Sequence, residues 1–465
     1  MTRSSLIAED ISAKQKNHLD REAPAIQRIS KRSFSLFLLD AYAILAAPLF
    51  FVYIRGGSMV WSYHYFMTHP ITFLSLVVFL TFFYIFDLYN PYKYFKPAQT
   101  STEILYSIFL GSMILAAVSY LDRTFLIART SFVFSAVLLW IFVFCIRMFY
   151  DVLFQIRTLD TKALIVGTGF LGQEIAQVIK RTPHSRIKIM GFVGQEEKTL
   201  RGNEAAFPIL GKVSSIPLLV REHEIRLLIL AGEPDLENLF TKQNVQVTSV
   251  VHLFEKLEGA IPYQVLNDHY FLSFADQVKR QSYVRAKRVF DILFSILFLV
   301  ALCPVFLVAT ALLSFQGTGK IFFIQTRIGK DGIPFKLIKF RTMTDGQNGE
   351  NSITRVGQWL RKYRIDELPQ MFNVLKGDMS LVGPRPEIPF FVEECQKWIP
   401  FYNVVLAVRP GLTGWAQVKF RYTTTEKDYE RKFCYNLYYL KNISPTLDIM
   451  ILLKTIRIIL LGRGQ

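Results

Sequence analysis

A long apolar stretch in the second half of the chain, residues 284–315, reads VRAKRVFDILFSILFLVALCPVFLVATALLSF. Proline inside a helix removes a hydrogen bond and bends or breaks the helix, so Pro304 predicts two half-helices. Half-helices of about a dozen residues reach about 18 Å, less than the roughly 30 Å hydrocarbon core of a bilayer. Basic residues flank both ends, among them Arg280 and Lys320. These features favour a re-entrant membrane helix, with a kinked fifth crossing as the alternative.

Four further apolar stretches precede this one, near residues 34–54, 70–89, 103–121 and 130–153. Each approaches the about 20 residues that a transmembrane helix needs, although buried helices of a soluble protein are the alternative. The loop between the second and third stretches carries Lys93 and Lys96, whereas Arg55 is the formal positive charge of the first loop. The positive-inside rule therefore places both ends of a four-helix unit in the cytoplasm.

The composition agrees with a protein that is partly embedded in a membrane. The chain has 465 residues, of which 51% are hydrophobic and 20% charged, with a net charge of +17. Such a basic excess indicates anionic partners, and beside apolar helices a lipid surface and phosphates are better candidates than nucleic acid. The four cysteines form no C-x-x-C pair, so neither a zinc site nor a disulfide framework is indicated.

A soluble segment lies between the two apolar regions. Residues 161–167 predict a buried strand, and a glycine turn with Gly167, Gly169 and Gly172 leads into a predicted helix. This G-x-G-x-x-G in a strand-turn-helix setting predicts a Rossmann-like α/β domain with a weak candidate nucleotide pocket. The second predicted strand does not end on a clear ribose-binding acid, since Glu196 lies just beyond it. A vestigial or regulatory nucleotide pocket, or a purely structural spacer, is therefore favoured over a catalytic dinucleotide site.

The densest group of charged residues lies downstream, at 360–370, where Asp366 and Glu367 stand among Arg361, Lys362 and Arg364. Phosphoryl transfer needs fixed cations and usually a divalent metal to neutralise the transferring group. A carboxylate can bind Mg²⁺ or act as a nucleophile that forms an acyl phosphate. The alternatives are a solvated helix start for the acids and a charged helix face for the cations.

Five ordered motifs in this region resemble those of the bacterial sugar transferases, the polyprenyl-phosphate hexose-1-phosphate transferases or monotopic phosphoglycosyl transferases. The motifs are Gln325-x-Arg327-x-Gly329, Lys339-Phe340-Arg341-Thr342-Met343, Asp366-Glu367-Leu368-Pro369-Gln370, Gly377-Asp378-Met379-Ser380-Leu381-Val382-Gly383-Pro384-Arg385-Pro386 and Arg409-Pro410-Gly411-Leu412-Thr413-Gly414-Trp415. The resemblance covers about residues 284–461. The upstream part resembles the large members that initiate exopolysaccharide, capsule or O-antigen synthesis.

The resemblance implies a role for each matched residue. Asp366 is the expected nucleophile, Glu367 assists it, and both are the expected Mg²⁺ ligands. Pro304 matches the break of the re-entrant helix. Four cations match positions that contact substrate phosphate: Lys339, Arg341, Arg361 and Arg385. This chain differs from smaller members of the family at Arg364, where they commonly have a serine. Arg364 therefore adds a cation beside the two acids.

The implied reaction transfers a hexose 1-phosphate from a UDP-sugar to undecaprenyl phosphate and releases UMP, with glucose as the favoured sugar and galactose as the alternative. The expected partners are therefore these two substrates and membrane lipid, with a homodimer by analogy to large members. The expected location is the bacterial inner membrane, with the catalytic domain facing the cytoplasm. A membrane-anchored NAD-dependent epimerase or oxidoreductase, and a non-enzymatic assembly scaffold, are the rival functions.

The expected fold class is membrane α plus α/β, with five parts in order. They are a cytoplasmic tail (1–33), four transmembrane helices (34–155), a Rossmann-like α/β domain (160–275), the re-entrant membrane helix (284–315) and a catalytic domain (316–465).

Overall fold

The computed structural model of the protein describes most of the chain in twelve segments. They are residues 31–54, 70–89, 95–121, 129–156, 160–182, 185–194, 207–231, 245–265, 281–316, 320–344, 352–420 and 425–462. The expected cytoplasmic tail up to residue 30, the loop charges Arg55 and Lys93, and Glu196 lie outside them. The chain divides into two compact units, one in Gln27–Val250 and the other in Val251–Gln465.

Four helices of the first unit coincide with the four apolar stretches. They are α2 (Lys31–Ile54), α4 (Pro70–Ile85), α5 (Pro97–Leu121) and α6 (Arg129–Ile156). Helix α2 contacts α4 and α6, and α5 contacts the same two helices. Three contain a segment long and apolar enough to span a membrane: Ser33–Phe50, Pro97–Tyr120 and Val133–Leu153. Helix α4 is apolar but shorter, so the number of crossings stays a prediction.

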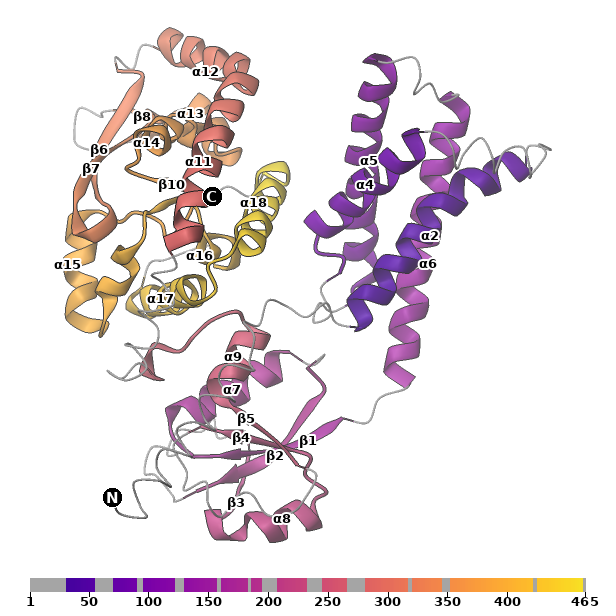
Figure 1. Ribbon diagram of the computed structural model, residues 1–465, viewed down its shortest axis with the longest axis vertical. Helices are drawn as coiled ribbons and strands as arrows, with labels where there is room; N and C mark the ends of the chain where they lie inside the picture. The colour runs from indigo at the N-terminus through magenta and orange to yellow at the C-terminus, as the bar shows by residue number, and fades with distance from the viewer. Residues whose placement is uncertain are drawn as a thin grey trace. The chain divides into compact units, whose positions relative to one another are not determined.

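The first unit also contains a five-stranded parallel sheet with the order β3-β2-β1-β4-β5. The strands are β1 (Thr161–Val166), β2 (Ile187–Val193), β3 (Ile209–Gly211), β4 (Leu227–Leu230) and β5 (Gln246–Ser249). Figure 1 shows helices α7 (Phe170–Arg181) and α8 (Ile216–Glu222) on opposite faces of the sheet. The predicted α/β character is confirmed, because apolar side chains of β1 and α8 share one buried cluster.

The second unit begins with helix α9 (Val250–Leu257), followed by the two halves of the predicted membrane helix. These halves are α11 (Gln281–Ala301) and α12 (Cys303–Phe315), bent by 62° at Leu302. The bend fits either a broken span or a re-entrant loop. Pro304 lies in the first turn of α12. A backbone N–H at this position has no acceptor within the helix, so proline causes no loss of a helical hydrogen bond.

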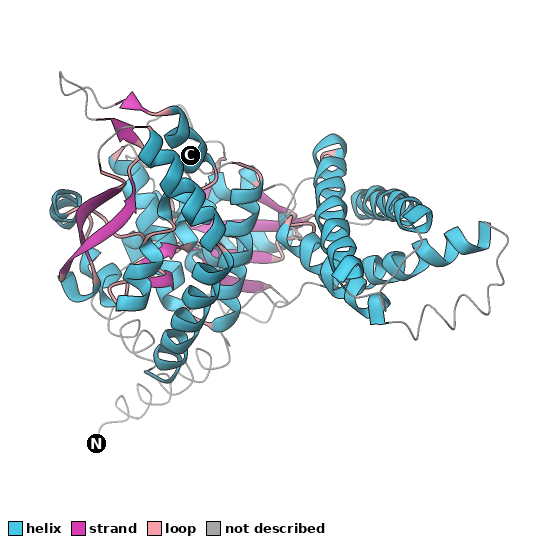
Figure 2. Ribbon diagram, turned by 90° about the horizontal axis from the view of Figure 1, so that it is seen from above, coloured by secondary structure: helices cyan, strands magenta, loops and turns pink. Residues whose placement is uncertain are grey.

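The rest of the second unit is mainly helical, as Figure 2 shows by colour. The strands are β6 (Phe322–Ile328), β7 (Pro334–Phe340), β8 (Met343–Thr344), β9 (Ser352–Ile353), β10 (Ser380–Val382) and β11 (Gly411–Thr413). The helices are α13 (Arg355–Lys362), α14 (Gln370–Lys376), α15 (Pro389–Trp398), α16 (Trp415–Lys419), α17 (Glu426–Lys441) and α18 (Pro445–Leu460). Short 3-10 helices are η4 (Val213–Ser215) in the first unit and η6 (Tyr263–Val265), η7 (Lys330–Gly332), η8 (Ile365–Glu367) and η9 (Tyr402–Ala407) in the second.

Polar residues bind the first half of the bent helix to the rest of the second unit. Tyr283 donates to Asp448 at 2.7 Å, and Lys287 forms an ion pair with the same carboxylate. Arg288 donates to the carbonyls of Val374 and Leu375 at the end of α14. Beyond residue 291, α11 and α12 instead expose large apolar side chains, including Leu297, Val300 and Leu307. The polar bonds thus lie at the start of α11, and these exposed apolar side chains lie beyond them.

Candidate active site

Asp366 and Glu367 lie in the 3-10 turn η8 between α13 and α14. Arg364, directly before the turn, has the left-handed values φ 54° and ψ 24°, which few residues other than glycine adopt. This reversal ends the preceding helix and directs the two acids into the domain, where they are 8% and 9% exposed. The acids are therefore not a solvated helix start.

Two arginines hold the Glu367 carboxylate. Arg385 donates to Oε1 at 3.1 Å, and Arg364 donates to Oε2 at 3.2 Å. Burial alone raises the pKa of Glu367, but Arg385 and Arg364 outweigh it and bring the pKa below its usual value. Glu367 is therefore an ionised, fixed group at neutral pH.

Asp366 is in a different state. Among the described residues its side chain makes no hydrogen bond and no ion pair, although Lys339, Arg361 and Arg364 act on it electrostatically. Burial, and then the charge of Glu367, raise the pKa of Asp366 to about 6. A carboxylate that is buried, near cations and free of partners is suited to attack an electrophile. The two neighbouring acids thus have separate roles.

The predicted phosphate-binding cations come from three different segments. Lys339 lies on β7, with its ammonium 5.1 Å from the Phe323 ring centre, and burial lowers the pKa of Lys339 although Asp366 opposes this. Arg361, near the end of α13, donates from Nε to the Thr342 hydroxyl at 2.9 Å. Arg341 follows β7, where its backbone N–H donates to Ile321. Lys339, Arg361 and Arg385 therefore converge on the acids, whereas Arg341 stays a prediction.

Asn373, to which the motif analysis assigned no role, fixes β7 against α14. Its side chain donates to the Lys336 carbonyl at 2.7 Å and accepts from the Ile338 N–H at 3.1 Å. It is 2% exposed. These two bonds position the strand that carries Lys339 relative to the helix that follows the acids. The sequence signal for this role was a polar asparagine among the apolar residues of the predicted helix.

The turn that carries Arg385 extends from the parallel pair β10 and β11. Gly383 and Gly411 approach so closely that a Cβ on Gly411 would lie 2.1 Å from the Gly383 nitrogen. Arg327 donates to the Pro386 carbonyl at 3.1 Å, and the Ile328 N–H bonds to the Glu387 carbonyl. The turn is therefore fixed by the packing of Gly383 on Gly411 and by its hydrogen bonds to Arg327 and Ile328. These contacts determine where the Arg385 side chain lies.

The segments that form this site lie in a region that matches a known protein family. Residues 282–462 match the family model of the bacterial sugar transferases. The chain belongs to the bacterial sugar transferase family. Residues 84–235 match a second family model, described as a CoA-binding domain, which includes most of the parallel sheet.

The names of several relatives of the sugar transferase domain include undecaprenyl phosphate as a substrate. A UDP-N-acetylgalactosamine-undecaprenyl-phosphate N-acetylgalactosaminephosphotransferase of Aeromonas hydrophila is 39% identical over 230 residues, 48% of this chain and 54% of that enzyme. A UDP-glucose:undecaprenyl-phosphate glucose-1-phosphate transferase of Caulobacter vibrioides is 39% identical over 37% of this chain and 68% of its own. An uncharacterized sugar transferase of Bacillus subtilis is 39% identical over 38% of this chain, and the match covers 89% of that protein.

The donor set of this sugar transferase domain fits a hard divalent cation. Mg²⁺ is commonly held by one or two carboxylates together with substrate phosphates and water. Within the described residues there is no cluster of three or more candidate metal ligands, which is compatible with such a sparse site. Asp366 offers an unengaged carboxylate, whereas each oxygen of Glu367 already accepts from an arginine. Asp366 is therefore the better of the two predicted ligands.

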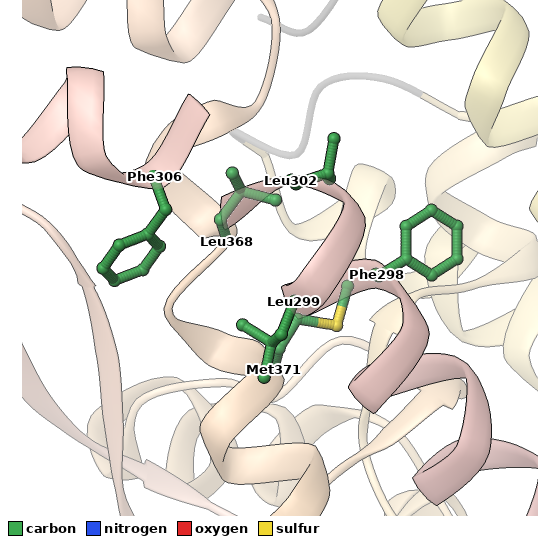
Figure 3. A pocket seen from close by; sticks show the side chains of 6 residues that line it. All are labelled: Phe298, Leu299, Leu302, Phe306, Leu368 and Met371. Atoms are coloured by element: carbon green, nitrogen blue, oxygen red, sulfur yellow. The ribbon is translucent and has the colours of Figure 1, made fainter. Parts of the chain in front are cut away.

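The helix break of the sugar transferase domain lies beside the segment that follows the acids, because Leu302 and Leu368 line the same hollow. An apolar hollow of about 210 Å³, which includes space open to solvent, lies at the break. Figure 3 shows its lining from both half-helices and from the segment that follows the acids. The lining residues are Phe298, Leu299, Leu302, Phe306, Leu368 and Met371. Leu368 directly follows Glu367, so apolar surface extends from the bent helix pair to the turn that carries the carboxylates.

The glycine turn of the α/β domain lies between β1 and α7, as its spacing predicted. Gly167 has φ +114°, and a Cβ on Gly172 would lie 2.4 Å from the Gly167 carbonyl oxygen. Gly169 precedes the first residue of α7. The positive φ of Gly167 and the close approach at Gly172 account for these two glycines without a ligand. A nucleotide in this turn stays a prediction.

Proposed function

We propose that this sugar transferase moves a hexose 1-phosphate from a UDP-sugar to undecaprenyl phosphate and releases UMP. The observation that carries the proposal is the contrast between Glu367, held by two arginines, and Asp366, which is free of partners among the described residues. The relatives named for the same acceptor support it, with glucose or N-acetylgalactosamine as the sugar in their names. We favour glucose for this chain, with galactose as an alternative.

The chemistry takes two steps. A carboxylate oxygen of Asp366 bonds to the β-phosphorus of the donor, while the bond from that phosphorus to the bridging oxygen breaks and UMP departs with the electron pair. This leaves a phosphosugar-aspartate. A phosphate oxygen of the lipid then bonds to the same phosphorus, and the bond to Asp366 breaks, which regenerates the carboxylate and gives the lipid diphosphate sugar.

The cations stabilise the charge of the donor. Lys339, Arg361 and Arg385 face the acids from three segments, and such fixed charges need no rearrangement when the transition state forms. Mg²⁺, when bound at Asp366, would neutralise further phosphate charge. Glu367 keeps Arg364 and Arg385 in place beside the reacting phosphorus.

We also propose that the bent pair α11 and α12 re-enters on the cytoplasmic face of the bacterial inner membrane. Helix α12 has 13 residues, about 20 Å of helix, which is shorter than the bilayer core. Polar bonds already tie the start of α11 to the catalytic core. The lipid phosphate and the acids then lie at the same interface. The product is the lipid-linked sugar that begins assembly of an exopolysaccharide, capsule or O-antigen.

The direct test is UMP release by the purified full-length protein in lipid nanodiscs. The donors are UDP-glucose, UDP-galactose and UDP-N-acetylgalactosamine, with undecaprenyl phosphate and Mg²⁺. We expect release from one donor and its loss when EDTA is added. Release that persists in EDTA would remove the metal from the proposal, and no release from any donor would favour the epimerase or scaffold functions.

The topology has its own test. Single cysteines in place of Arg285 and Lys320, in a variant that lacks the four native cysteines, are treated with a membrane-impermeant maleimide in oriented vesicles. Re-entry predicts that both react from the same side. Reaction from opposite sides would establish a fifth crossing.

A further inference from the structure

Gln417 is a buried amide of the sugar transferase domain that the proposed reaction does not use. It lies in the short helix α16, and both polar atoms of its side chain are buried without a hydrogen-bond partner among the described residues. Buried polar groups are almost always paired, and an amide offers two donors and an acceptor. The Gln417 amide therefore has an unused donor and an unused acceptor with which a ligand group can form hydrogen bonds.

The position of Gln417 relates it to the acids. A Cβ on Gly414 would lie 3.3 Å from Gln417 Oε1 and 2.1 Å from the Gly383 carbonyl oxygen, so the amide lies close to the Gly383 backbone. Gly383 and Gly414 follow the carboxyl ends of the parallel strands β10 and β11. Two residues after Gly383, Arg385 reaches Glu367. Ligands of parallel α/β sheets commonly bind at such carboxyl ends.

On the other side of α16, Trp415 packs against neighbouring segments. Trp415 donates to the Gly259 carbonyl at 2.7 Å and stacks on Tyr438 with ring centres 5.6 Å apart. Residues two positions apart on a helix point to roughly opposite sides, so Gln417 is directed away from that contact. Trp415 thereby anchors the helix, and the anchored helix holds the amide beside the Arg385 turn.

We infer that the Gln417 amide recognises the part of the nucleotide sugar that is not phosphate. The inference rests on the proposed function. The group that Gln417 recognises must place a hydrogen-bond donor next to a hydrogen-bond acceptor. An amide matches this pattern with a pair of hydrogen bonds. Two parts of the donor present this pattern: the edge of the uracil ring, and the hydroxyl or acetamido groups of the hexose. In either case Gln417 is a binding and specificity residue.

The test compares Gln417→Leu and Gln417→Glu with wild type, all as full-length protein in nanodiscs. Gln396→Leu is the matched control, because Gln396 is an exposed glutamine of the same domain whose side chain bonds to Asn403. For each protein the KM and kcat are measured with the three UDP-sugars, UMP binding is measured by calorimetry, and thermal unfolding is recorded.

For Gln417→Leu we expect a rise of about tenfold in KM, as loss of hydrogen bonds to the donor implies, with kcat within about threefold. A matching loss of UMP affinity assigns the amide to uracil. A rise in KM for only some sugars, with UMP affinity unchanged, assigns it to the hexose. If Gln417→Leu does not fold, the isosteric Gln417→Glu carries the same comparison.

Unchanged KM and UMP affinity in both variants would overturn the inference, whether or not their unfolding temperature falls, because the amide would then be a structural group only. This result is distinct from failure of the proposed function, since wild type would still release UMP. If wild type releases no UMP from any donor, the proposed function itself fails.

Discussion

The Oε1 atom of Glu367 lies 3.1 Å from Nη2 of Arg385, a bond across 18 residues of sequence. Arg364 takes the other oxygen of Glu367, and no such bond reaches Asp366 among the described residues. Two carboxyls that are adjacent in the chain therefore have opposite pKa directions, lowered for Glu367 and raised for Asp366. Pairs of acids whose environments separate them in this way commonly divide the work of a reaction.

The raised pKa of Asp366 predicts that Asp366→Asn stabilises the protein at pH 8. A carboxyl with a folded pKa of about 6 instead of 3.8 disfavours folding by at most about 3 kcal/mol above both values. The gain should shrink as the pH falls from about 6 towards 4, because the group is then neutral in both folded and unfolded states. Thermal unfolding at pH 8 and pH 5 checks this. A gain that grows at pH 5 would contradict it.

Glu367→Gln, the matched change at the neighbouring acid, should have the opposite effect. It leaves Arg385 and Arg364 without their carboxylate, which we expect to destabilise the protein by about 3 kcal/mol at pH 8. Because the folded pKa of Glu367 is lowered, this contribution is present above the unfolded pKa and is lost as the pH falls through the folded value. Equal unfolding temperatures for wild type and variant at pH 8 would show that the two ion pairs are not formed.

The first half-reaction should depend on pH through Asp366. The ionised carboxylate is the reactive form, so UMP release should fall below about pH 6 and reach a plateau above it. Bound Mg²⁺ would shift the midpoint downward, since a cation favours the carboxylate. Initial rates from pH 5 to pH 8, in the absence of lipid acceptor, provide the profile. A rate that rises on acidification would exclude this role.

Arg385→Ala should slow UMP release by about 10²- to 10³-fold, the usual effect of removing one group that stabilises transition-state charge. Arg385→Lys should restore only part of the rate, because an ammonium cannot reproduce the planar guanidinium. Arg355→Ala is the control, since Arg355 is an exposed arginine at the start of α13. Similar rates for Arg385→Ala and the control would remove Arg385 from the site.

A buried ion pair between α2 and α6 provides a prediction for the apolar helices. Arg147 donates both terminal nitrogens to Asp40, at 3.2 and 2.6 Å, and both residues are buried. Arg147→Leu alone leaves an uncompensated charge and should cost about 3–5 kcal/mol, more than the double change Asp40→Leu with Arg147→Leu. Thermal unfolding in nanodiscs compares the two. A single variant as stable as the double variant would show that the pair is not needed.

Much of the fold follows from local sequence. The buried strand expected at residues 161–167 is strand β1, which ends at Val166 because Gly167 takes φ +114° and begins the turn. The apolar pattern at 70–89 overestimates its helix, which ends at Ile85. After the helix ends, Asp87 takes φ 63° and Leu88 is buried. The apolar pattern of the sequence therefore extends beyond the end of the helix.

The site was predictable where it is local, and not where it depends on distant segments. Asp366, Glu367 and Arg361 lie within seven residues, so their proximity follows from the sequence. The bond from Arg385 to Glu367, and the Asn373 side chain that ties β7 to α14, depend on how separate segments pack. The bond from Trp415 to Gly259 spans 156 residues and has no local signal.

The central claim is that Asp366 forms a covalent intermediate. The most direct measurement is the intact mass of the full-length protein after incubation with its UDP-sugar and Mg²⁺, without lipid acceptor. We predict a mass increase equal to one hexose phosphate in wild type, located on Asp366 by peptide mapping and removed by undecaprenyl phosphate, and no increase in Asp366→Asn. Adduct formation by Asp366→Asn, or UMP release from wild type with no adduct at any time, would contradict the account.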